Sequence, residues 1–447
     1  LLLKKWVNDQ KLDRLRIIGK KSIQERVFDK SKGYYVRKKK EILIEYLNHN
    51  INFITECYHG GRNEQYWFGP AFSDNWIDID LASAYPTAMS LIGLPYWEDI
   101  YRTTKVDDFK LTTLGFAWVE FKFPENTRFP TLPIRTSNGL VFPLQGISYC
   151  SAPEVFLAKQ LGCKIKVLDA VIVPTDDQQK VFEPFIKECI SKRNIAGSKT
   201  LRGLFWKEIS NSTYGKTAQG LRERQVYDMR DKKTKVLPES AITNAGFAAY
   251  ITSFARATLG ELMNSVNKDS MVFSCTTDGF ITNMPKENIE KITRGPLANL
   301  YRETRKNLAV DDKIIEIKHE VRMPMGWRTR GQATLEQHPH LEDLKEGIIL
   351  AKGGIFTKPE SETTYQQNEE IINLFFNRES TGPNSKITVE SMIGIRDIVE
   401  NDADMVSREF EKRLSMEYDW KRQPLTPKES VKYNHVQFAT RPWENVD

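Results

Sequence analysis

The sequence predicts a mixed α/β (α+β) fold made of several packed units, and three observations lead to this prediction. With 447 residues the chain is too long for one compact core, since domains average about 150 residues. Short runs that alternate apolar and polar residues, such as Ile77 to Asp80, are typical of strands. Longer stretches such as Ala245 to Val266 have the spacing of a buried helix. We therefore expect strands and helices interleaved along one chain.

Composition narrows the class of protein. Lysine plus arginine exceed aspartate plus glutamate by only 65 to 59, so the average charge says little. No apolar run approaches the roughly 20 residues of a membrane span, and no signal peptide opens the chain. The first residue is Leu1, which leads us to expect a further domain upstream. The five cysteines show no C-x-x-C spacing, which argues against disulfides or structural zinc and for a reducing compartment: Cys57, Cys150, Cys163, Cys189 and Cys275.

The first 56 residues are charged, and we expect them to be largely helical. Basic clusters at Lys20–Lys21 and 37–40 precede an apolar periodic stretch at 42–47, and a solvated helix face explains such clusters more often than DNA does. Next comes Y-H-G-G at 58–61, where adjacent glycines allow either a tight turn or the close approach of another backbone.

Residues 76–89 contain the first candidate for chemistry. A strand here places Ile77 and Ile79 on one face and Asp78 and Asp80 on the other, with one carboxylate at the strand's end. The small and polar run at 83–87 predicts a turn that leaves the sheet, a place where catalytic residues are often presented. On this stretch alone, an ordinary strand with a solvated acidic edge is the favoured explanation.

The residues that follow, up to about 162, show patterns of secondary structure and no candidate for chemistry. A strand is expected at 114–123, a hairpin turn at Asn138-Gly139, and a helix opened by the capping box of Ser151 and Glu154.

Residues 181–220 predict two helices joined near Gly197. On the second helix Lys207, Asn211 and Tyr214 stand at i, i+4 and i+7, within one narrow stripe. From 181 to 236 there are 13 basic residues against 6 acidic ones, a local excess larger than the +6 of the whole chain. A solvated face is the alternative explanation for such a stripe.

Farther along, Asp278-Gly279 lies between two apolar runs, which is a strong hairpin signal. By itself this signal indicates only a turn aspartate. A charged hairpin is expected at 225–236, and a strand at 313–321 leads into a basic loop at 326–331. Beyond about 345 the pattern is helical, most clearly at 368–376 and 389–414.

Two carboxylates at strand ends, Asp80 and Asp278, could hold two Mg²⁺ ions, which prefer a few hard oxygen ligands plus substrate phosphates. Such a pair suits in-line attack on a phosphoryl group. A polymerase also needs cations on the incoming triphosphate, which Lys207 and Arg193 or Lys199 could supply, whereas a nuclease does not.

These stretches resemble a known family. D-L-A-S-A-Y-P-T at 80–87, K-E-I-S-N-S-T-Y-G at 207–215 and C-T-T-D-G at 275–279 resemble motifs A, B and C of family B DNA polymerases, in the family's order and spacing. Y-H-G-G at 58–61 resembles the Y-x-G-G element of the protein-primed subgroup, which contacts template DNA. The resemblance spans about residues 57 to 345.

The resemblance implies a role for each matching residue. Asp80 and Asp278 would bind two Mg²⁺ ions, with Mn²⁺ as a substitute, and the Leu81 carbonyl would be a backbone ligand. Tyr85 would be the steric gate against ribonucleotides. The remaining roles are incoming-nucleotide contacts for Lys207, Asn211, Arg193 and Lys199, and DNA contacts for Tyr58, Gly60, Gly61, Tyr214, Gly215, Arg328 and Arg330.

Two departures from the family pattern point to a subgroup. Thr276 stands where motif C usually has a first aspartate, and Arg328-Thr329-Arg330 replaces the K-x-Y element that holds the primer end. In both departures the chain resembles the primer-independent polymerases of self-replicating mobile elements.

The resemblance therefore implies a right-hand polymerase that adds deoxynucleotides by two-metal phosphoryl transfer. Its alternatives are a metal-dependent nuclease and an inactive DNA-binding polymerase relic.

The expected partners are template DNA, nascent DNA and dNTPs, with a terminal protein as one source of the priming hydroxyl. We expect a monomer without membrane contact, located in the cytoplasm of the host cell of a phage or mobile element. The expected units are an N-terminal helical segment joined to a missing exonuclease domain at 1–56, the palm with an insertion at 57–180, fingers at 181–220, the second palm part at 221–345 and a helical thumb at 346–447.

Overall fold

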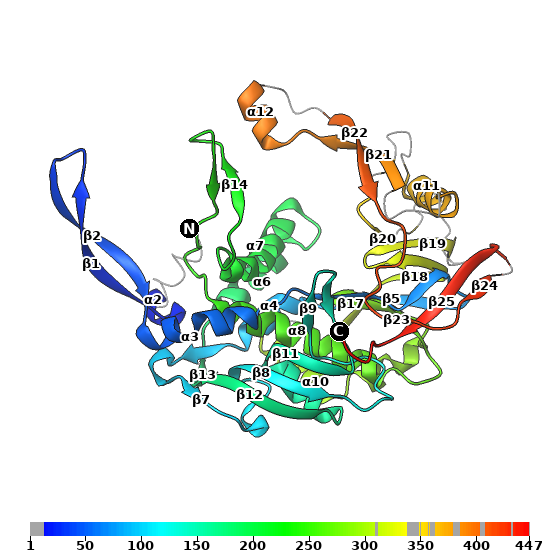
Figure 1. Ribbon diagram of the computed structural model, residues 1–447, viewed down its shortest axis with the longest axis horizontal. Coiled ribbons are helices and arrows are strands. Elements are labelled where there is room, and N and C mark those ends of the chain that lie inside the picture. The colour runs from blue at the N-terminus through cyan, green and yellow to red at the C-terminus, as the bar shows by residue number, and fades with distance from the viewer. Residues whose placement is uncertain are drawn as a thin grey trace.

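The computed structural model describes residues 13–308, 312–337, 348, 350–355, 357, 363–378, 385–402, 407–430 and 432–446. Strands and helices form one broad body, and two hairpins and a third arm project from it in the same direction (Figure 1). Strands and helices are interleaved along the chain, which confirms the predicted α/β class.

The body is built on a large sheet, which we call the palm sheet. Its central strand, β5 (Trp76–Leu81), lies between β17 and β18 and pairs with both in antiparallel register. Strands far apart in sequence thus meet at one place. The order along the sheet is β23-β25-β4-β18-β5-β17-β16-β3. The bounds are β3 Arg62–Gln65, β4 Trp67–Pro70, β16 Val272–Thr277, β17 Gly279–Thr282, β18 Ile315–Arg328, β23 Gln423–Pro424 and β25 His435–Arg441, with β19 (Gly331–Gln337), β20 (Ala351–Lys352) and β24 (Lys428–Ser430) paired at the side.

One long helix, α8 (Ala245–Ser265), forms the core behind this sheet and is buried along nearly its whole length. Its start is fixed by Asn244, whose side chain accepts a hydrogen bond from the Phe247 amide. The small residues of α8 let neighbouring elements approach closely, and its apolar side chains belong to the same core cluster as Ile77 and Ile79 of β5. Helices α3 (Glu45–Glu56), α4 (Ala84–Ser90), α9 (Ile289–Ile292) and α10 (Pro296–Asn307) complete this layer.

A second, four-stranded sheet occupies the predicted palm insertion, with order β11-β8-β12-β7. It confirms the expected strand, β8 (Leu114–Lys122), and the hairpin turn between β9 (Ile134–Thr136) and β10 (Gly139–Val141). The capping box opens α5 (Ala152–Gln160) as predicted. The other strands are β6 Gly93–Pro95, β7 Tyr101–Arg102, β11 Gln145–Ser151, β12 Lys164–Val173 and β13 Thr175–Lys180.

The two expected helices of the fingers are present as α6 (Glu183–Ala196) and α7 (Leu201–Ala218). Gly197, with φ 87°, ends the first, and Thr200 caps the second by accepting from the Gly203 amide at 3.0 Å. The predicted charged hairpin follows as β14 (Gln225–Asp228) and β15 (Lys233–Val236).

The prediction of a largely helical N-terminal segment is wrong. After the short α2 (Arg14–Ile18), β1 (Lys20–Asp29) and β2 (Tyr34–Leu43) form an antiparallel hairpin before α3 begins. Gly33, with φ 73°, lies in its turn. The period-2 pattern of Ile23, Val27 and Val36 is diluted by charged residues on both faces, so the basic runs concealed two strands.

The prediction that the chain is helical beyond about residue 345 is also only partly correct. Helix α11 (Thr364–Phe376) confirms the expectation at 368–376. The stretch 389–414 is instead the end of β21 (Ser385–Met392), the short α12 (Ile395–Asn401) and β22 (Ser407–Leu414), and the two strands pair over their whole length. Alternating charged and apolar residues at 385–392 fit a strand, and the longer helical period was the wrong choice.

Two local predictions need correction as well. The segment after β5 is a single left-handed residue, Ser83 (φ 56°), followed by α4, so the expected turn at 83–87 is mostly helix. Pro86 fits there because it lies in the first turn of the helix, where the amide has no helical partner. The expected basic loop at 326–331 belongs to β18 up to Arg328, and only Thr329 and Arg330 form the turn.

Candidate active site

The structure brings Asp80 and Asp278 together at one end of the palm sheet. Asp80 lies near the end of β5 and pairs in register with Gly279, the residue after Asp278. The Leu81 amide donates to the Asp278 carbonyl at 2.8 Å, which fixes the two backbones relative to each other. The alternation of β5 is as predicted, with Ile77 and Ile79 buried and both aspartates half-buried on the other face.

The turn that carries Asp278 depends on Gly279. A Cβ on Gly279 would lie 2.0 Å from Asp80 Oδ1 and 2.5 Å from the Ile79 carbonyl oxygen, so no other residue fits beside the carboxylate. Thr277 adopts a left-handed conformation (φ 58°), and the Asp278 amide donates to the Thr276 carbonyl at 2.7 Å. The sequence signal for a plain hairpin turn therefore also marks a close packing of Gly279 against the Asp80 carboxylate.

Burial and mutual repulsion perturb these carboxyl groups. Burial, followed by the charge of Asp80, raises the pKa of Asp278 to about 6 and that of Asp78 to about 7. The pKa of Asp80 is raised too, mainly by burial, and Lys318 opposes this shift. Partly desolvated carboxylates that repel each other are stabilised in their ionised form by a bound cation.

Sequence reasoning did not identify two charged residues beside this pair. Lys318, on β18, places its Nζ 3.9 Å from Asp80 Oδ2 and 2.9 Å from Glu316 Oε2. Glu316 pairs in register with Asp80 across the sheet. The charged alternation of 316–320 was the available signal, but only the register with β5 reveals that it faces the aspartates.

The carboxylate oxygens of Asp80 and Asp278 are suitable ligands for Mg²⁺. The described residues contain no group of three or more His, Cys, Asp or Glu that would form a metal cage. Two hard carboxylates, Asp80 and Asp278, are what Mg²⁺ takes from a protein when substrate phosphates and water supply its other ligands. Their raised pKa values agree with a site made for positive charge.

A cleft of about 460 Å³ lies between the aspartates and the fingers helices. Helices α6 and α7 line one side, and α4 and the palm strands line the other. Most of the residues predicted to contact metal and nucleotide line it: Asp80, Leu81, Tyr85, Arg193, Lys207, Asn211 and Asp278. Tyr214, predicted to contact DNA, lines it as well. The stripe on α7 thus faces the cleft, so its residues are not merely a solvated surface.

Arg193 has a free hydrogen-bond donor that could bind an anion. Its Nε is buried and has no hydrogen-bond partner within the described chain. Lys199 does not line the cleft; it is exposed in the turn between α6 and α7. Lys192 is also directed elsewhere, with its ammonium 4.6 Å from the ring centre of Trp206.

Two tyrosines, Tyr85 and Tyr214, line the cleft. Tyr85 on α4 stacks against Tyr214 on α7, with ring centres 4.2 Å apart and planes 6° from parallel. Burial, then Asp278, raises the pKa of Tyr85 to about 12, and burial together with the Tyr58 phenol raises the pKa of Tyr214. The stack joins the palm to the fingers and places the Tyr85 ring close to the Asp278 carboxylate.

The Y-H-G-G segment lies directly under the Asp278 turn. A Cβ on Gly61 would be 2.8 Å from Thr277 Cγ2, whereas one on Gly60 would meet nothing within 4 Å. Of the two explanations open for these glycines, the structure supports close approach for Gly61. Gly215, on the fingers, likewise has open space.

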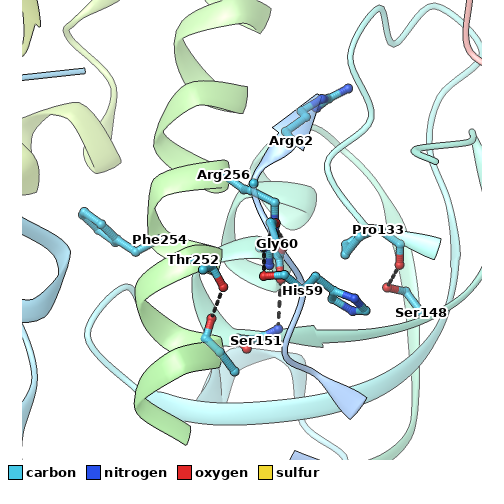
Figure 2. Close-up of polar contacts among 12 residues, drawn as sticks. His59, Gly60, Arg62, Pro133, Ser148, Ser151, Thr252, Phe254 and Arg256 are labelled. Atoms are coloured by element: carbon cyan, nitrogen blue, oxygen red, sulfur yellow. Dashed lines mark hydrogen bonds and ion pairs between the residues drawn. The ribbon is translucent and has the colours of Figure 1, made fainter. Parts of the chain in front are cut away.

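Arg256 of α8, which the sequence did not single out, holds this segment (Figure 2). Its Nη1 donates to the carbonyls of His59 at 2.8 Å and Gly60 at 2.5 Å, and its Nε donates to Glu154 Oε1 at 2.8 Å. Glu154 Oε2 also accepts from the Ser151 amide, within the capping box of α5. A buried ion pair therefore links two helices to the loop beneath the carboxylates.

The arginines of the R-T-R turn are placed differently from each other. Arg330 donates to Thr277 Oγ1 at 2.8 Å and Asn63 Oδ1 at 3.2 Å. Burial raises the pKa of Asp278, and the charge of Arg330 partly opposes this rise. Arg328 Nη1 donates to the Ser415 carbonyl at 3.0 Å. Arg330 is thus beside the carboxylates, whereas Arg328 joins the palm sheet to the C-terminal segment.

A palm sheet with paired carboxylates, faced by a two-helix fingers unit, defines a right-hand polymerase. The ternary complex of Phi29 DNA polymerase with primer-template DNA and incoming nucleotide shares this fold, with a TM-score of 0.53 at 14% identity over 84% of this chain and 63% of that one.

The sequence comparisons identify the family. The family model described as DNA polymerase type B, organellar and viral, matches residues 23–288. The chain is 37% identical over 405 residues to the primer-independent DNA polymerase PolB of Escherichia coli, which covers 88% of this chain and 45% of that protein. It is 28% identical over 165 residues to the DNA-directed DNA polymerase of Enterobacteria phage PRD1, covering 36% of this chain and 28% of that one. The chain belongs to the family B DNA polymerases, and it spans less than half the length of these curated relatives.

Proposed function

We propose that the chain carries out template-directed DNA synthesis by adding deoxynucleotides to a growing strand. The observation that carries this proposal is the cleft in which Asp80 and Asp278 face Lys207, Asn211 and Arg193. Carboxylates for metal ions stand on one side and cations for a triphosphate stand on the other. A nuclease needs only the first set.

The carboxylates supply the metal site. Asp80 and Asp278 would hold two Mg²⁺ ions, or Mn²⁺ in their place, which would supply activation of the attacking 3′ hydroxyl and charge stabilisation for the leaving pyrophosphate. The Leu81 carbonyl is close enough in sequence to add a backbone oxygen. Lys318 competes with the metal for Asp80, since its ammonium stands 3.9 Å from that carboxylate.

The fingers residues orient the nucleotide. Lys207 and Arg193 bind the triphosphate oxygens, the arginine through its unpartnered Nε. Asn211 lies one turn farther along α7 on the same stripe and contacts the sugar or base. Tyr85 would be the steric gate against a ribose 2′ hydroxyl, because its ring lines the cleft and is held by its stack on Tyr214.

The DNA contacts complete the proposal. Tyr58, Gly60 and Gly61 would contact the template near the Asp278 turn, and Tyr214 and Gly215 the nascent base pair. Arg330 would hold the triphosphate of an initiating nucleotide, because its guanidinium donates to the Thr277 hydroxyl beside the carboxylates. Lys199 contributes to phosphate binding only if the turn before α7 moves toward the cleft.

We further propose that synthesis can begin without an annealed primer, as the name of the E. coli relative says of that protein. A terminal protein supplying the first hydroxyl is the alternative mode of initiation. In the described residues no helix is long and apolar enough to cross a membrane. We propose that the protein works as a monomer in the cytoplasm of the cell that hosts its element.

An incorporation assay tests the proposal. With Mg²⁺, dNTPs and a primed template, the wild-type chain should extend the primer and copy the template sequence. Loss of primer length without dNTPs would instead indicate a nuclease. DNA binding without either reaction would indicate an inactive relic.

A further inference from the structure

The β1–β2 hairpin is an arm without a binding partner in the described chain. It projects from the body at the end opposite the thumb arm of β21 and β22 (Figure 1). Most of its side chains are exposed. A two-stranded hairpin that covers no apolar core is only marginally stable in water. The hairpin therefore adds little to the stability of the fold, and a binding role would explain its presence.

The arm is strongly basic. Residues 20–43 contain nine lysines and arginines and three acidic residues, so the net charge of this short arm equals the +6 of the whole chain. Two of the acids are neutralised locally: Glu25 pairs with Lys40 at 3.2 Å, and Glu41 pairs with Arg14 at the root of the arm. The third, Asp29, accepts from the Ser31 hydroxyl in the turn.

One face of the arm concentrates the charge. The register places Arg26 opposite Arg37 and Gln24 opposite Lys39, and it places Phe28 opposite Tyr35 on the same face nearer the turn. Directly opposed like charges destabilise a strand pair. Within the described residues none of these three cations has an ion pair, so an anion that bridges them would remove the repulsion.

The same face carries exposed aromatic rings. Phe28 is 48% exposed and Tyr35 60% exposed, and their ring centres lie 5.3 Å apart in an edge-to-face arrangement. The Arg26 guanidinium lies 5.4 Å from the centre of the Tyr35 ring. Cations beside exposed aromatic rings are the combination that holds unpaired nucleotides, through phosphates and base stacking.

The root of the arm is fixed to the segment that leads from β15 into α8. Lys20 pairs with Glu239, Arg14 donates to the Ala241 carbonyl at 3.0 Å, and the Asn244 amide side chain donates to the Ile18 carbonyl at 3.1 Å. The segment that contains these partners is in turn bonded to the end of α7 by Ser240 Oγ, which donates to the Lys216 carbonyl at 2.6 Å. The arm thus has a defined position relative to the helix that carries Lys207.

We propose that the β1–β2 arm binds single-stranded DNA, namely the template strand on the fingers side of the cleft, with the face formed by Gln24, Arg26, Phe28, Tyr35, Arg37 and Lys39. The choice of template DNA as the nucleic acid rests on the proposed function. The choice of single-stranded over duplex DNA rests on the exposed rings, because paired bases offer no free face for stacking.

The test compares two variants of the 447-residue chain that lose the same charge. One is Arg26→Gln/Arg37→Gln/Lys39→Gln on the proposed face, and the control is Lys30→Gln/Lys32→Gln/Lys38→Gln on the turn and opposite face. Binding of labelled oligothymidine is measured over a range of salt concentrations. Each phosphate contact on a single strand contributes about 0.7 to the slope of log K against log salt, so the first variant should lower the slope by about 2 and the control by less than about 0.7.

A second variant tests the rings. Phe28→Leu/Tyr35→Leu keeps an apolar cross-strand pair and the net charge, and it should weaken oligothymidine binding at least about five-fold. Blunt duplex DNA should bind the Leu variant as tightly as it binds wild type. Unchanged oligothymidine binding by this variant, equal slopes for the two charge variants, or equal losses on duplex DNA would each overturn the proposal.

These measurements need no catalysis. If the wild-type chain adds no nucleotide but the arm variants show the expected losses, the proposed function fails and the arm's binding role stands. If the chain extends primers and the arm variants bind oligothymidine like wild type, the reverse holds.

Discussion

Asp80 and Asp278 are the residues on which the proposed chemistry depends most directly. We expect Asp80→Ala or Asp278→Ala to lower nucleotide addition by about 10³-fold or more, because a lost metal ligand removes about 4 kcal/mol or more of transition-state stabilisation. DNA binding should remain, since phosphate contacts are made elsewhere. Single-turnover primer extension measures the first quantity and filter binding the second.

Asp78→Asn is the matched control for this experiment. Asp78 is on the same face of β5, one step farther from the end of the strand, and it opposes Ile281 where Asp80 opposes Gly279. We expect a much smaller loss of activity. A loss as large as that of Asp80→Ala would show that the wrong aspartate was assigned to the metal.

The raised pKa of Asp278 predicts a pH-dependent cost to folding. The pKa is about 6 in the folded chain against an ordinary value of 3.8, so the folded state binds more protons between these values. The free energy of unfolding therefore falls as pH rises from about 4 to about 6 and stays low above that. Asp278→Asn should abolish this cost.

Thermal unfolding without divalent metal measures this effect. At about pH 8, Asp278→Asn should melt about 1–3 °C higher than wild type, and at about pH 4 the two should coincide. Added Mg²⁺ should raise the melting temperature of wild type more than that of the variant, because the ion stabilises the ionised carboxylate. A variant less stable than wild type at both pH values would contradict the assignment.

Tyr85 is predicted to exclude ribonucleotides by its ring. Tyr85→Ala should lower the preference for deoxynucleotides about 10-fold or more, because the selection comes from a clash with the wrong substrate. Tyr85→Phe keeps the ring and its stack on Tyr214, so it should keep the preference. Ratios of kcat/KM for dNTP and rNTP decide the matter, and an unchanged ratio in the Ala variant would place the gate elsewhere.

At the scale of elements, the packing of the Y-H-G-G loop under the Asp278 turn can be tested with two adjacent glycines. Gly61→Ala should displace Thr277, whose Cγ2 would lie 2.8 Å from the new methyl group, and so misplace Asp278. Gly60→Ala meets nothing within 4 Å and is the matched control. Primer extension should fall about 10²-fold for Gly61→Ala and little for Gly60→Ala. Equal effects would mean that the loop acts through contacts with DNA instead.

The elements that sequence reasoning predicted correctly are those with strong local signals. Helix α8 has an unbroken apolar and small-residue pattern, and the Asp278 hairpin has its Asp-Gly pair. The β1–β2 hairpin was mistaken for a helix because its strands are exposed on both faces, so no side of the sheet demands an apolar period of two. Charge without burial leaves little periodic signal to read.

The sequence predicted those residues of the site that belong to local motifs. Asp80, Asp278 and the α7 stripe were identified because each lies on a local pattern. Lys318 and Arg256 were missed because their roles come from register and tertiary packing: Lys318 lies beside Asp80 only across the β5–β18 pair, and Arg256 reaches the loop of His59 from a helix 197 residues away in sequence.

At the scale of the whole molecule, the R-T-R turn joins the carboxylate site to the C-terminal segment. The sequence suggested that Arg328 and Arg330 share one function in starting strands. The structure separates them, since Arg330 contacts Thr277 and Asn63 near the carboxylates while Arg328 donates to the Ser415 carbonyl. The second arginine of the turn is therefore the one that lies beside the Asp278 turn.

Arg330→Ala should consequently reduce unprimed initiation by about 10-fold more than it reduces extension of a long annealed primer. An initiating nucleotide carries a triphosphate that a primer end lacks, and a guanidinium grips phosphate oxygens bidentately. Arg328→Ala should lower both activities in parallel, because it loosens the C-terminal segment without removing a phosphate contact at the site. Both activities are measured on the same preparations, with circular single-stranded DNA for initiation. If Arg330→Ala also lowers both in parallel, and lowers the salt slope of duplex binding by about 0.9, the arginine is a backbone phosphate contact and initiation must depend on other residues.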